Sequence, residues 1–223
     1  KDHKDAYDYW FETMHKFGLG VAFDTDIPFE LTGNIPSRAY FDKLYRGSWN
    51  ALTVRSLSIG QGEILVTPLQ LANLAVIIGN KGFYYKPHLL KSIVGDTTLP
   101  ETYTEKIETG VSSEHFEIVK QSMLDVFEGD HGTARYYKIE GILAGGKTGT
   151  VQNPHGDDHS MFIAFAPYDN PQIALAVVVE NAGYGSTWAA PIATLMIERY
   201  LKGESNRPAL EKRMMETSHN KAL

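Results

Sequence analysis

A glycine-rich run late in the chain carries the residues best suited to bind a ligand. Residues 143–150 read Leu-Ala-Gly-Gly-Lys-Thr-Gly-Thr, which places three glycines, one cation and two hydroxyl groups within eight positions. Glycines leave the backbone open to close approach, and apolar segments flank the run on both sides. Its chemistry depends on whether the chain continues from here as a helix or as a strand.

A phosphate-binding loop is the first interpretation of this run. Residues 141–148 satisfy G-x-x-x-x-G-K-[ST] letter for letter. Such a loop must lead directly into a helix, because the helix N-terminus completes the anion site. Here Gly149 follows, then the strand-like pair Thr150-Val151 and an Asn-Pro turn. Glycine disfavours a helix interior, and the residue before a proline is pushed out of the helical region. The run is therefore predicted to lie on a strand.

Two further segments of strand character follow this one. We expect strands over residues 142–152, 161–167 and 173–180. The links between them are too short for crossover helices, so the three should form an antiparallel meander. The last segment is apolar without alternation, which favours a central strand with both faces covered.

Four segments predict helices, over residues 5–17, 67–79, 112–128 and 188–201. The second has the clearest start: Thr67 is the N-cap, Pro68 takes the first helical position and Gln70 closes a capping box. It is apolar nearly all round and should be buried on most sides. The third should begin at a serine cap and turn five apolar residues inward: Phe116, Val119, Met123, Val126 and Phe127.

The remaining segments are less regular. Residues 20–55 are punctuated by Gly, Pro, Asn and Asp, and we expect a long ordered excursion without regular structure. Residues 87–94 could form a short strand, and a polar loop should follow to about residue 110. Residues 204–223 are polar and are expected to form a frayed tail.

Composition bounds the function. The chain has 223 residues, a net charge of −6 and no cysteine, so disulfides, thiol nucleophiles and Cys-ligated zinc are excluded. No basic patch argues for a nucleic-acid partner, and no run reaches the ~18–20 apolar residues of a membrane span. The chain begins at Lys1 inside an expected helix, which suggests a piece of a longer protein.

Several short motifs follow one another along the chain: Ile-Gly-Gln-Gly at 59–62, Val-Thr-Pro-Leu-Gln-Leu-Ala at 66–72, Gly-Thr-Ala at 132–134 and Ala-Gly-Gly-Lys-Thr-Gly-Thr-Val-Gln at 144–152. Taken in their order and spacing, these motifs resemble those of the class B high-molecular-weight penicillin-binding transpeptidases. Other stretches resemble the elongation-specific branch, the penicillin-binding protein 2 family: residues 158–159, 165–168, 170–172 and 179–181. The resemblance covers about residues 9–202.

The resemblance implies an α+β fold of the β-lactamase/transpeptidase type, an antiparallel sheet with helices on both faces, incomplete in this chain. Residues 1–203 would be the C-terminal portion of the transpeptidase domain and residues 204–223 a tail. Two N-terminal strands of the family fold would cover the last strand of the sheet, whose apolar edge would otherwise be exposed.

The resemblance also assigns roles to residues 147–150. Thr148 and Thr150 share one face of the strand, and in the family such hydroxyls hold the terminal carboxylate of a D-Ala-D-Ala peptide or its β-lactam mimic. Gly149 leaves room for a peptide along the strand edge. The backbone N–H of Thr150 would be an oxyanion-hole donor, and Lys147 would supply positive potential beside the nucleophile and help to bind the carboxylate.

The family also needs a nucleophilic serine in S-x-x-K and then an S-x-N motif, both before K-T-G. This chain spells S-x-x-K only at 218–221, in its polar tail, and S-x-N at 48–50, in the irregular segment. Both are interpreted as chance. The nucleophile is therefore expected upstream of Lys1, and this chain alone should form no adduct with a penicillin in an intact-mass experiment.

One cluster of metal-like side chains lies at His155, Asp157, Asp158 and His159. A loop this short rarely wraps tetrahedrally around an ion, so we expect no metal. Asp158 and His159 are instead expected to fix the start of the next strand near the rim of the site, where Gln152 should also lie.

The resemblance implies a peptidoglycan D,D-transpeptidase with no cofactor. Its ligands would be stem peptides ending in D-Ala-D-Ala and β-lactam antibiotics, and its partners a glycosyltransferase and elongation-complex proteins. It would act in the cell envelope, on the periplasmic side of the inner membrane, with its anchor upstream of this chain. Two alternatives stay open: a β-lactam-sensing receptor domain and a non-catalytic scaffold of the same family.

Overall fold

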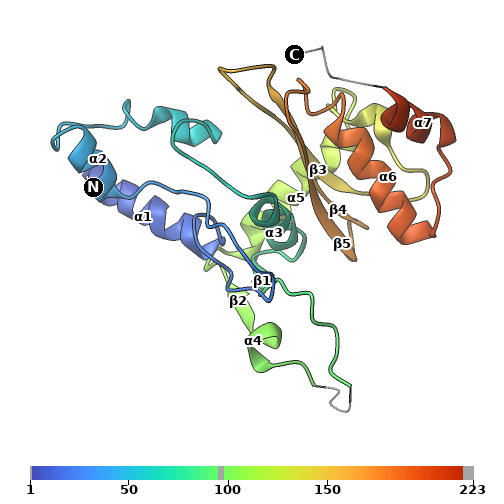
Figure 1. Ribbon diagram of the computed structural model, residues 1–223, viewed down its shortest axis with the longest axis horizontal. Helices are drawn as coiled ribbons and strands as arrows, with labels where there is room; N and C mark the ends of the chain where they lie inside the picture. The colour runs from blue at the N-terminus through green and yellow to red at the C-terminus, as the bar shows by residue number, and fades with distance from the viewer. Residues whose placement is uncertain (1, 95–97, 218–223) are drawn as a thin grey trace. The chain divides into compact units, whose positions relative to one another are not determined.

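The computed structural model describes residues 2–94 and 98–217, and the chain forms two compact units (Figure 1). The first unit comprises residues 1–70 and 83–111, and the second residues 71–82 and 112–223. The S-x-x-K spelling at 218–221 lies outside the described residues. None of the helices described is long and apolar enough to span a bilayer.

An aromatic cluster organises the start of the first unit. Helix α1, His3–Lys16, begins at Asp2, whose carboxylate accepts a hydrogen bond from the Lys4 N–H, and the helix predicted over residues 5–17 is confirmed. The cluster joins Tyr7 of α1 to Phe41, Trp49 and Leu57.

Regular structure interrupts the segment that was expected to have none. Helix α2, Arg38–Leu44, lies within residues 20–55 and is capped by the Ser37 side chain. The 3-10 helix η1, Arg55–Ile59, follows shortly after. The prediction for this segment was wrong in this respect, because helices of one or two turns are too short for a periodic pattern to emerge.

Helix α3, Pro68–Gly79, begins as predicted. The side chain of Gln70 accepts a hydrogen bond from the Thr67 N–H at 3.0 Å, and the Thr67 hydroxyl accepts one from the Gln70 N–H at 3.2 Å. This is the predicted capping box. Residues 69–79 of the helix are all buried or half-buried, which confirms the prediction made from its apolar surface.

The strand predicted over residues 87–94 is wrong. The first unit instead forms a two-stranded antiparallel sheet of β1, Phe83–Tyr85, and β2, Lys106–Glu108, with α4, Glu101–Thr104, before β2. The carboxylate of Asp26 accepts hydrogen bonds from the N–H groups of Leu89 and Leu90, both at 2.8 Å. These amides are therefore taken by a side chain rather than by a strand partner.

The second unit is built on the predicted meander. Its strands are β3, Gly145–Val151, β4, His159–Ala166, and β5, Ile173–Val179, paired antiparallel in the order β3-β4-β5. The expectation that β5 lies centrally is wrong for the residues described, since β4 is the middle strand. Only Leu175 of β5 is buried. An apolar run without alternation reports apolar surroundings but does not determine strand order.

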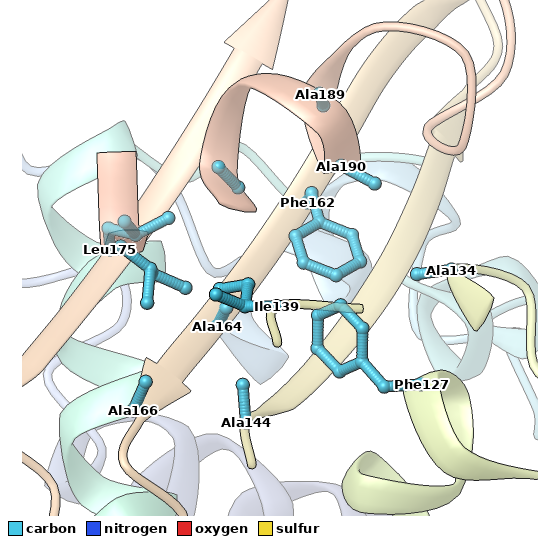
Figure 2. Close-up of a cluster of buried hydrophobic side chains, with 12 residues drawn as sticks. Phe127, Ala134, Ile139, Ala144, Phe162, Ala164, Ala166, Leu175, Ala189 and Ala190 are labelled. Atoms are coloured by element: carbon cyan, nitrogen blue, oxygen red, sulfur yellow. The ribbon is translucent and has the colours of Figure 1, made fainter. Parts of the chain in front are cut away.

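Helices cover both faces of this sheet, as predicted. Helix α6, Ala189–Lys202, packs on the face that carries Phe162 and Ala164, and small residues of α6 let the layers approach closely (Figure 2). The ring of Phe127, near the end of helix α5, Ser113–Glu128, meets Phe162 edge to face, with 5.7 Å between centroids.

Helix α5 turns one unexpected side chain inward on the opposite face. Val119 was predicted inside but is 43% exposed, whereas Lys120 is buried. The Lys120 ammonium donates to the Gly79 carbonyl at the end of α3, at 3.1 Å, and lies over the ring of Phe165. The lysine therefore provides the carbonyl of the last residue of α3 with a partner.

The segment after α6 is not frayed over its first part. Helix α7, Pro208–Glu216, follows a turn in which Arg207 donates to the buried Glu198 carboxylate at 2.7 Å. Arg207 also donates to the Thr194 hydroxyl and to the Tyr137 carbonyl in the 3-10 helix η2, Arg135–Tyr137. This contact fixes the start of α7 on α6, so the expectation of a frayed tail was wrong here.

Candidate functional site

Strand β3 presents the Lys-Thr-Gly residues on an open edge. Among the residues described, β3 pairs with β4 alone. The Lys147 ammonium donates to the Thr148 carbonyl at 2.6 Å, which places that carbonyl away from β4. Because backbone groups two residues apart point the same way in a strand, the N–H of Thr150 also faces this edge. The edge thus offers a donor and an acceptor to an added extended chain.

Lys147 and Thr150 are exposed, and Thr148 and Gly149 are half-buried. Thr148 and Thr150 lie on one face of the strand, as the sequence predicted from their spacing. The Thr148 hydroxyl lies 3.1 Å from the Thr133 hydroxyl. Four predicted binding residues are therefore together on one short stretch, with Thr133 as a neighbour from another segment.

The turn that carries Thr133 is held against the end of α5. The Ala134 N–H donates to the Val126 carbonyl at 3.0 Å, and Ala134 is fully buried. A Cβ on Gly132 would lie 2.4 Å from the same carbonyl oxygen, so only glycine fits there. The Gly-Thr-Ala sequence thus positions the Thr133 hydroxyl against Thr148 of the K-T-G strand.

The glycines of β3 serve packing more than ligand approach. A Cβ on Gly145 would lie 2.4 Å from the Phe165 ring, and one on Gly146 would lie 2.5 Å from the Phe162 ring. Gly149 is less confined, since its Cβ would lie 3.2 Å from that of Met161. The initial interpretation of the run as backbone left open for a ligand therefore applies best to Gly149.

A loop that the sequence did not flag lies over Gly149. The buried hydroxyl of Ser160 donates to the Tyr184 carbonyl at 2.9 Å and accepts from the Ala189 N–H at 3.1 Å. Between these anchors, a Cβ on Gly185 would lie 2.3 Å from the Met161 carbonyl oxygen and 2.5 Å from that of Gly149. The one sequence signal for this contact was the position of Ser160, a polar residue on the apolar face of a strand.

The expected rim residues close the β3–β4 turn. Asp158 accepts from the Asn153 N–H at 3.3 Å, and His159 Nδ1 accepts from the Asn181 N–H at 3.0 Å. Strand β4 begins at His159, so these contacts fix its start as predicted. Gln152 is exposed just beyond β3. Across the described part of the chain, no three His, Cys, Asp or Glu side chains gather as a metal site would require.

The S-x-N spelling at 48–50 has structural roles in the first unit. Trp49 is buried and donates to the Asp42 carboxylate at 2.8 Å. The side chain of Asn50 accepts from the Leu52 N–H at 2.9 Å. Both contacts explain these residues without a catalytic function.

Residues 3–198 match the family described as the penicillin-binding protein transpeptidase domain. The chain is 34% identical to the peptidoglycan D,D-transpeptidase MrdA of Haemophilus influenzae, over 89% of this chain and 33% of that protein. It is also similar to the Pseudomonas aeruginosa PBP2 solved in complex with WCK 5153, with a TM-score of 0.77 and 34% identity over 91% of this chain and 44% of the other.

A third match is a chain from a structure titled for the coordination of polymerization and crosslinking by a peptidoglycan synthase complex. Its TM-score is 0.78, at 26% identity over 92% of this chain and 35% of that one. The present chain thus spans about a third of the length of the curated relative it matches. By its matched residues, its fold and its identity to MrdA, the chain belongs to the penicillin-binding protein transpeptidase family.

Proposed function

We propose that this chain is the substrate-holding part of a peptidoglycan D,D-transpeptidase that cross-links stem peptides ending in D-Ala-D-Ala. The observation that carries the proposal is the open edge of β3. This edge carries the side chains of Lys147, Thr148 and Thr150. It also offers the Thr150 N–H as a donor and the Thr148 carbonyl as an acceptor. Membership of the transpeptidase family gives this edge its chemistry.

The substrate would lie antiparallel along β3 as an added strand. The hydroxyls of Thr148 and Thr150 would hold the terminal carboxylate, with Lys147 adding a charge-assisted contact. A serine hydroxyl would attack the carbonyl carbon of the D-Ala–D-Ala peptide bond. The N–H of Thr150 would stabilise the resulting oxyanion, a contact worth about 2.7–4 kcal/mol at comparable sites.

Collapse of the tetrahedral intermediate would break the peptide bond and release the terminal D-Ala, whose nitrogen takes a proton. The acyl group would stay on the serine until the amine of a second stem peptide attacks the ester and frees the hydroxyl. The nucleophilic serine and the base that activates it would lie in the protein N-terminal to residue 1. A β-lactam would enter the same sequence at its strained amide and remain as the acyl adduct.

The wider setting follows from the relatives. The whole protein would work in the cell envelope on the periplasmic side of the inner membrane, alongside a glycosyltransferase and elongation-complex proteins. A matched chain comes from a peptidoglycan synthase complex, which supports this setting. The relative from Haemophilus influenzae carries the transpeptidase name, which favours an enzyme over the receptor and scaffold alternatives.

The test is acylation of the full-length protein by benzylpenicillin, followed by intact mass and by the second-order rate constant. Lys147→Ala should slow acylation about 10- to 100-fold, as expected for loss of a charge-assisted hydrogen bond. Thr150→Pro removes the N–H that faces the open edge, where a strand tolerates proline, together with the Thr150 hydroxyl, and should slow acylation by at least about 10²- to 10³-fold.

Lys212→Ala is the matched control, because Lys212 is exposed on α7 and pairs only loosely with Glu216, at 3.9 Å. It should acylate at the wild-type rate. The proposal fails if the wild-type protein forms no adduct, or if Thr150→Pro is acylated as fast as the control.

A further inference from the structure

A cavity of about 400 Å³ lies beside the K-T-G strand in the second unit. It is lined by the turn before β3, by the loop between β5 and α6, and by α7. Its lining residues are Thr133, Tyr136, Tyr137, Ser186, Thr187, Trp188, Arg213, Met214 and Thr217. Of these residues, only Thr133 was placed at the K-T-G strand above.

Two walls of the cavity are tied directly to β3. Thr133 lines the cavity and its hydroxyl lies 3.1 Å from that of Thr148. The second wall, Ser186 and Thr187, follows Gly185, whose backbone is pressed against Gly149. A ligand held by Thr148 on the strand therefore lies next to a residue that lines the cavity.

The third wall, α7, is fixed by buried contacts. Arg207, directly before α7, donates to Glu198 at 2.7 Å, and the Glu198 side chain is only 2% exposed. Further along the helix, Arg213 donates to the Tyr137 hydroxyl at 3.3 Å and lies over the Tyr137 ring. The guanidinium is thereby held at the cavity wall by a residue that also lines it.

The lining has the chemistry of an anion site. Among the residues that the structure describes, it holds one cation, Arg213, and no acidic side chain, with hydroxyls from Thr133, Ser186 and Thr187. The hydrogen bond to Tyr137 uses one of the five N–H donors of the guanidinium. The fork geometry of an arginine suits a carboxylate, and Trp188 and Tyr136 supply flat apolar surface around it.

We propose that this cavity is an accessory subsite that binds a carboxylate-bearing group of the ligand held on β3, and that Arg213 is the residue that recognises it. The inference rests on the proposed function, because it takes β3 as the place where the ligand is held. It adds a specificity determinant outside the Lys-Thr-Gly residues.

The experiment compares two penicillins that differ by one carboxylate: benzylpenicillin and its α-carboxy derivative. Second-order acylation rate constants are measured for the full-length protein and for the Arg213→Gln, Arg213→Lys and Lys212→Gln variants. The readout is the ratio of the rate constant of the α-carboxy compound to that of benzylpenicillin. The ratio cancels any general effect of a substitution on the acylating serine.

In Arg213→Gln the ratio should fall at least about threefold, a size suited to an exposed ion pair. It should recover in part in Arg213→Lys, which keeps the charge but loses the fork. Lys212→Gln removes the neighbouring charge and should leave the ratio unchanged. Melting temperatures of both glutamine variants show whether α7 has stayed in place.

An unchanged ratio in Arg213→Gln, with an unchanged melting temperature, overturns the subsite. An equal fall in Lys212→Gln also overturns it, because the effect would then be the general field of α7. Failure of the proposed function gives a different result, since the wild-type protein would form no adduct with either penicillin.

Discussion

At the scale of single residues, the K-T-G strand separates glycines that pack from glycines that leave space. Gly145 and Gly146 sit under the rings of Phe165 and Phe162, so their small size serves the core. Gly185 serves neither a turn nor a ligand directly, because its backbone lies against the carbonyls of Met161 and Gly149. Gly185 thus represents a third kind of glycine, whose lack of a side chain lets a loop approach strand β3 closely.

Gly185→Ala tests that close approach. The added Cβ would meet two backbone oxygens, at 2.3 and 2.5 Å, so the loop must lift from β3. We expect a loss of about 1–3 kcal/mol in the free energy of unfolding, typical of overpacking, together with slower acylation by benzylpenicillin. Thermal melting and the acylation rate constant measure the two effects.

Gly183→Ala is the control in the same loop. A Cβ there meets nothing within 4 Å, but the residue has φ +74°, so the cost should be only about 1 kcal/mol of backbone strain. Equal stability and equal acylation rates in the two variants would show that the contact at Gly185 does not matter.

The residue-level site was predictable only where its parts are adjacent in sequence. The spacing of Thr148 and Thr150 fixes their common face, because a strand has a period of two. The contact of Thr148 with Thr133 spans fifteen positions and depends on how the turn after α5 is held. No local pattern reports such a contact. The role of Ser160 likewise depends on a loop that lies 24 residues away.

At the scale of elements, the start of α3 shows how one residue can cap a helix and hold a distant segment. Gln70 accepts from the Thr67 N–H, and its amide nitrogen donates to the carbonyls of Val21 and Thr32, at 3.0 and 2.8 Å. Its side chain is almost fully buried. The capping box was readable from the sequence, but the bonds to residues 21 and 32 were not.

Gln70→Glu separates these two roles. A glutamate keeps the shape and still accepts from the Thr67 N–H, but it places a buried oxygen against two carbonyl oxygens. We expect a loss of about 2–4 kcal/mol, the cost of unsatisfied buried polar groups, measured as a lower melting temperature. The exposed Gln172→Glu is the matched control and should change little. A melting temperature equal to that of the control would contradict the role given to the amide nitrogen.

Elements with a long periodic pattern were predicted well, and short ones were not. Helices α1, α3, α5 and α6 carry a pattern over twelve residues or more, and each strand of the meander carries one over seven or more. Helix α2 and the β1–β2 pair are shorter and depend on their neighbours. A short strand was expected over residues 87–94, but the Asp26 carboxylate takes the amide groups of Leu89 and Leu90 there. A side chain 63 positions away in the sequence therefore takes the place of a strand partner after Pro87.

At the scale of the whole molecule, the sheet of the second unit has an apolar outer strand. Among the residues described, β5 pairs with β4 alone, and its side chains are all apolar. An edge of this kind favours pairing with a further strand. The chain spans about a third of its curated relative, and we propose that strands from the remaining protein cover this edge, as the family resemblance implies.

The stability of the second unit also depends on one buried charge. Burial alone would raise the pKa of Glu198, but the hydrogen bond from Arg207 and the charges of Arg207 and Lys202 outweigh burial and hold the pKa below its ordinary value. The folded state therefore binds this proton less readily than the unfolded state, where a glutamate has a pKa of about 4.3. The stabilisation that ionised Glu198 provides is complete above that pH. It is lost as the pH falls through the lower pKa of the folded state.

Glu198→Gln should destabilise the protein at neutral pH by about 3 kcal/mol, because it leaves Arg207 without its carboxylate in a largely buried site. Arg207 joins α6, η2 and α7, so the loss should loosen α7 and the wall of the cavity together.

The measurement is the difference in melting temperature between wild type and the Glu198→Gln variant from pH 7 down to pH 3. That difference should be largest at neutral pH and shrink as the pH falls below the ordinary pKa of a glutamate, where the unfolded chain takes up the proton more readily than the folded one. Glu216→Gln removes an exposed carboxylate of α7 and should show a small difference at every pH. A difference for Glu198→Gln that stays constant down to pH 3 would mean that shape, and not the charge of Glu198, holds α7 on α6.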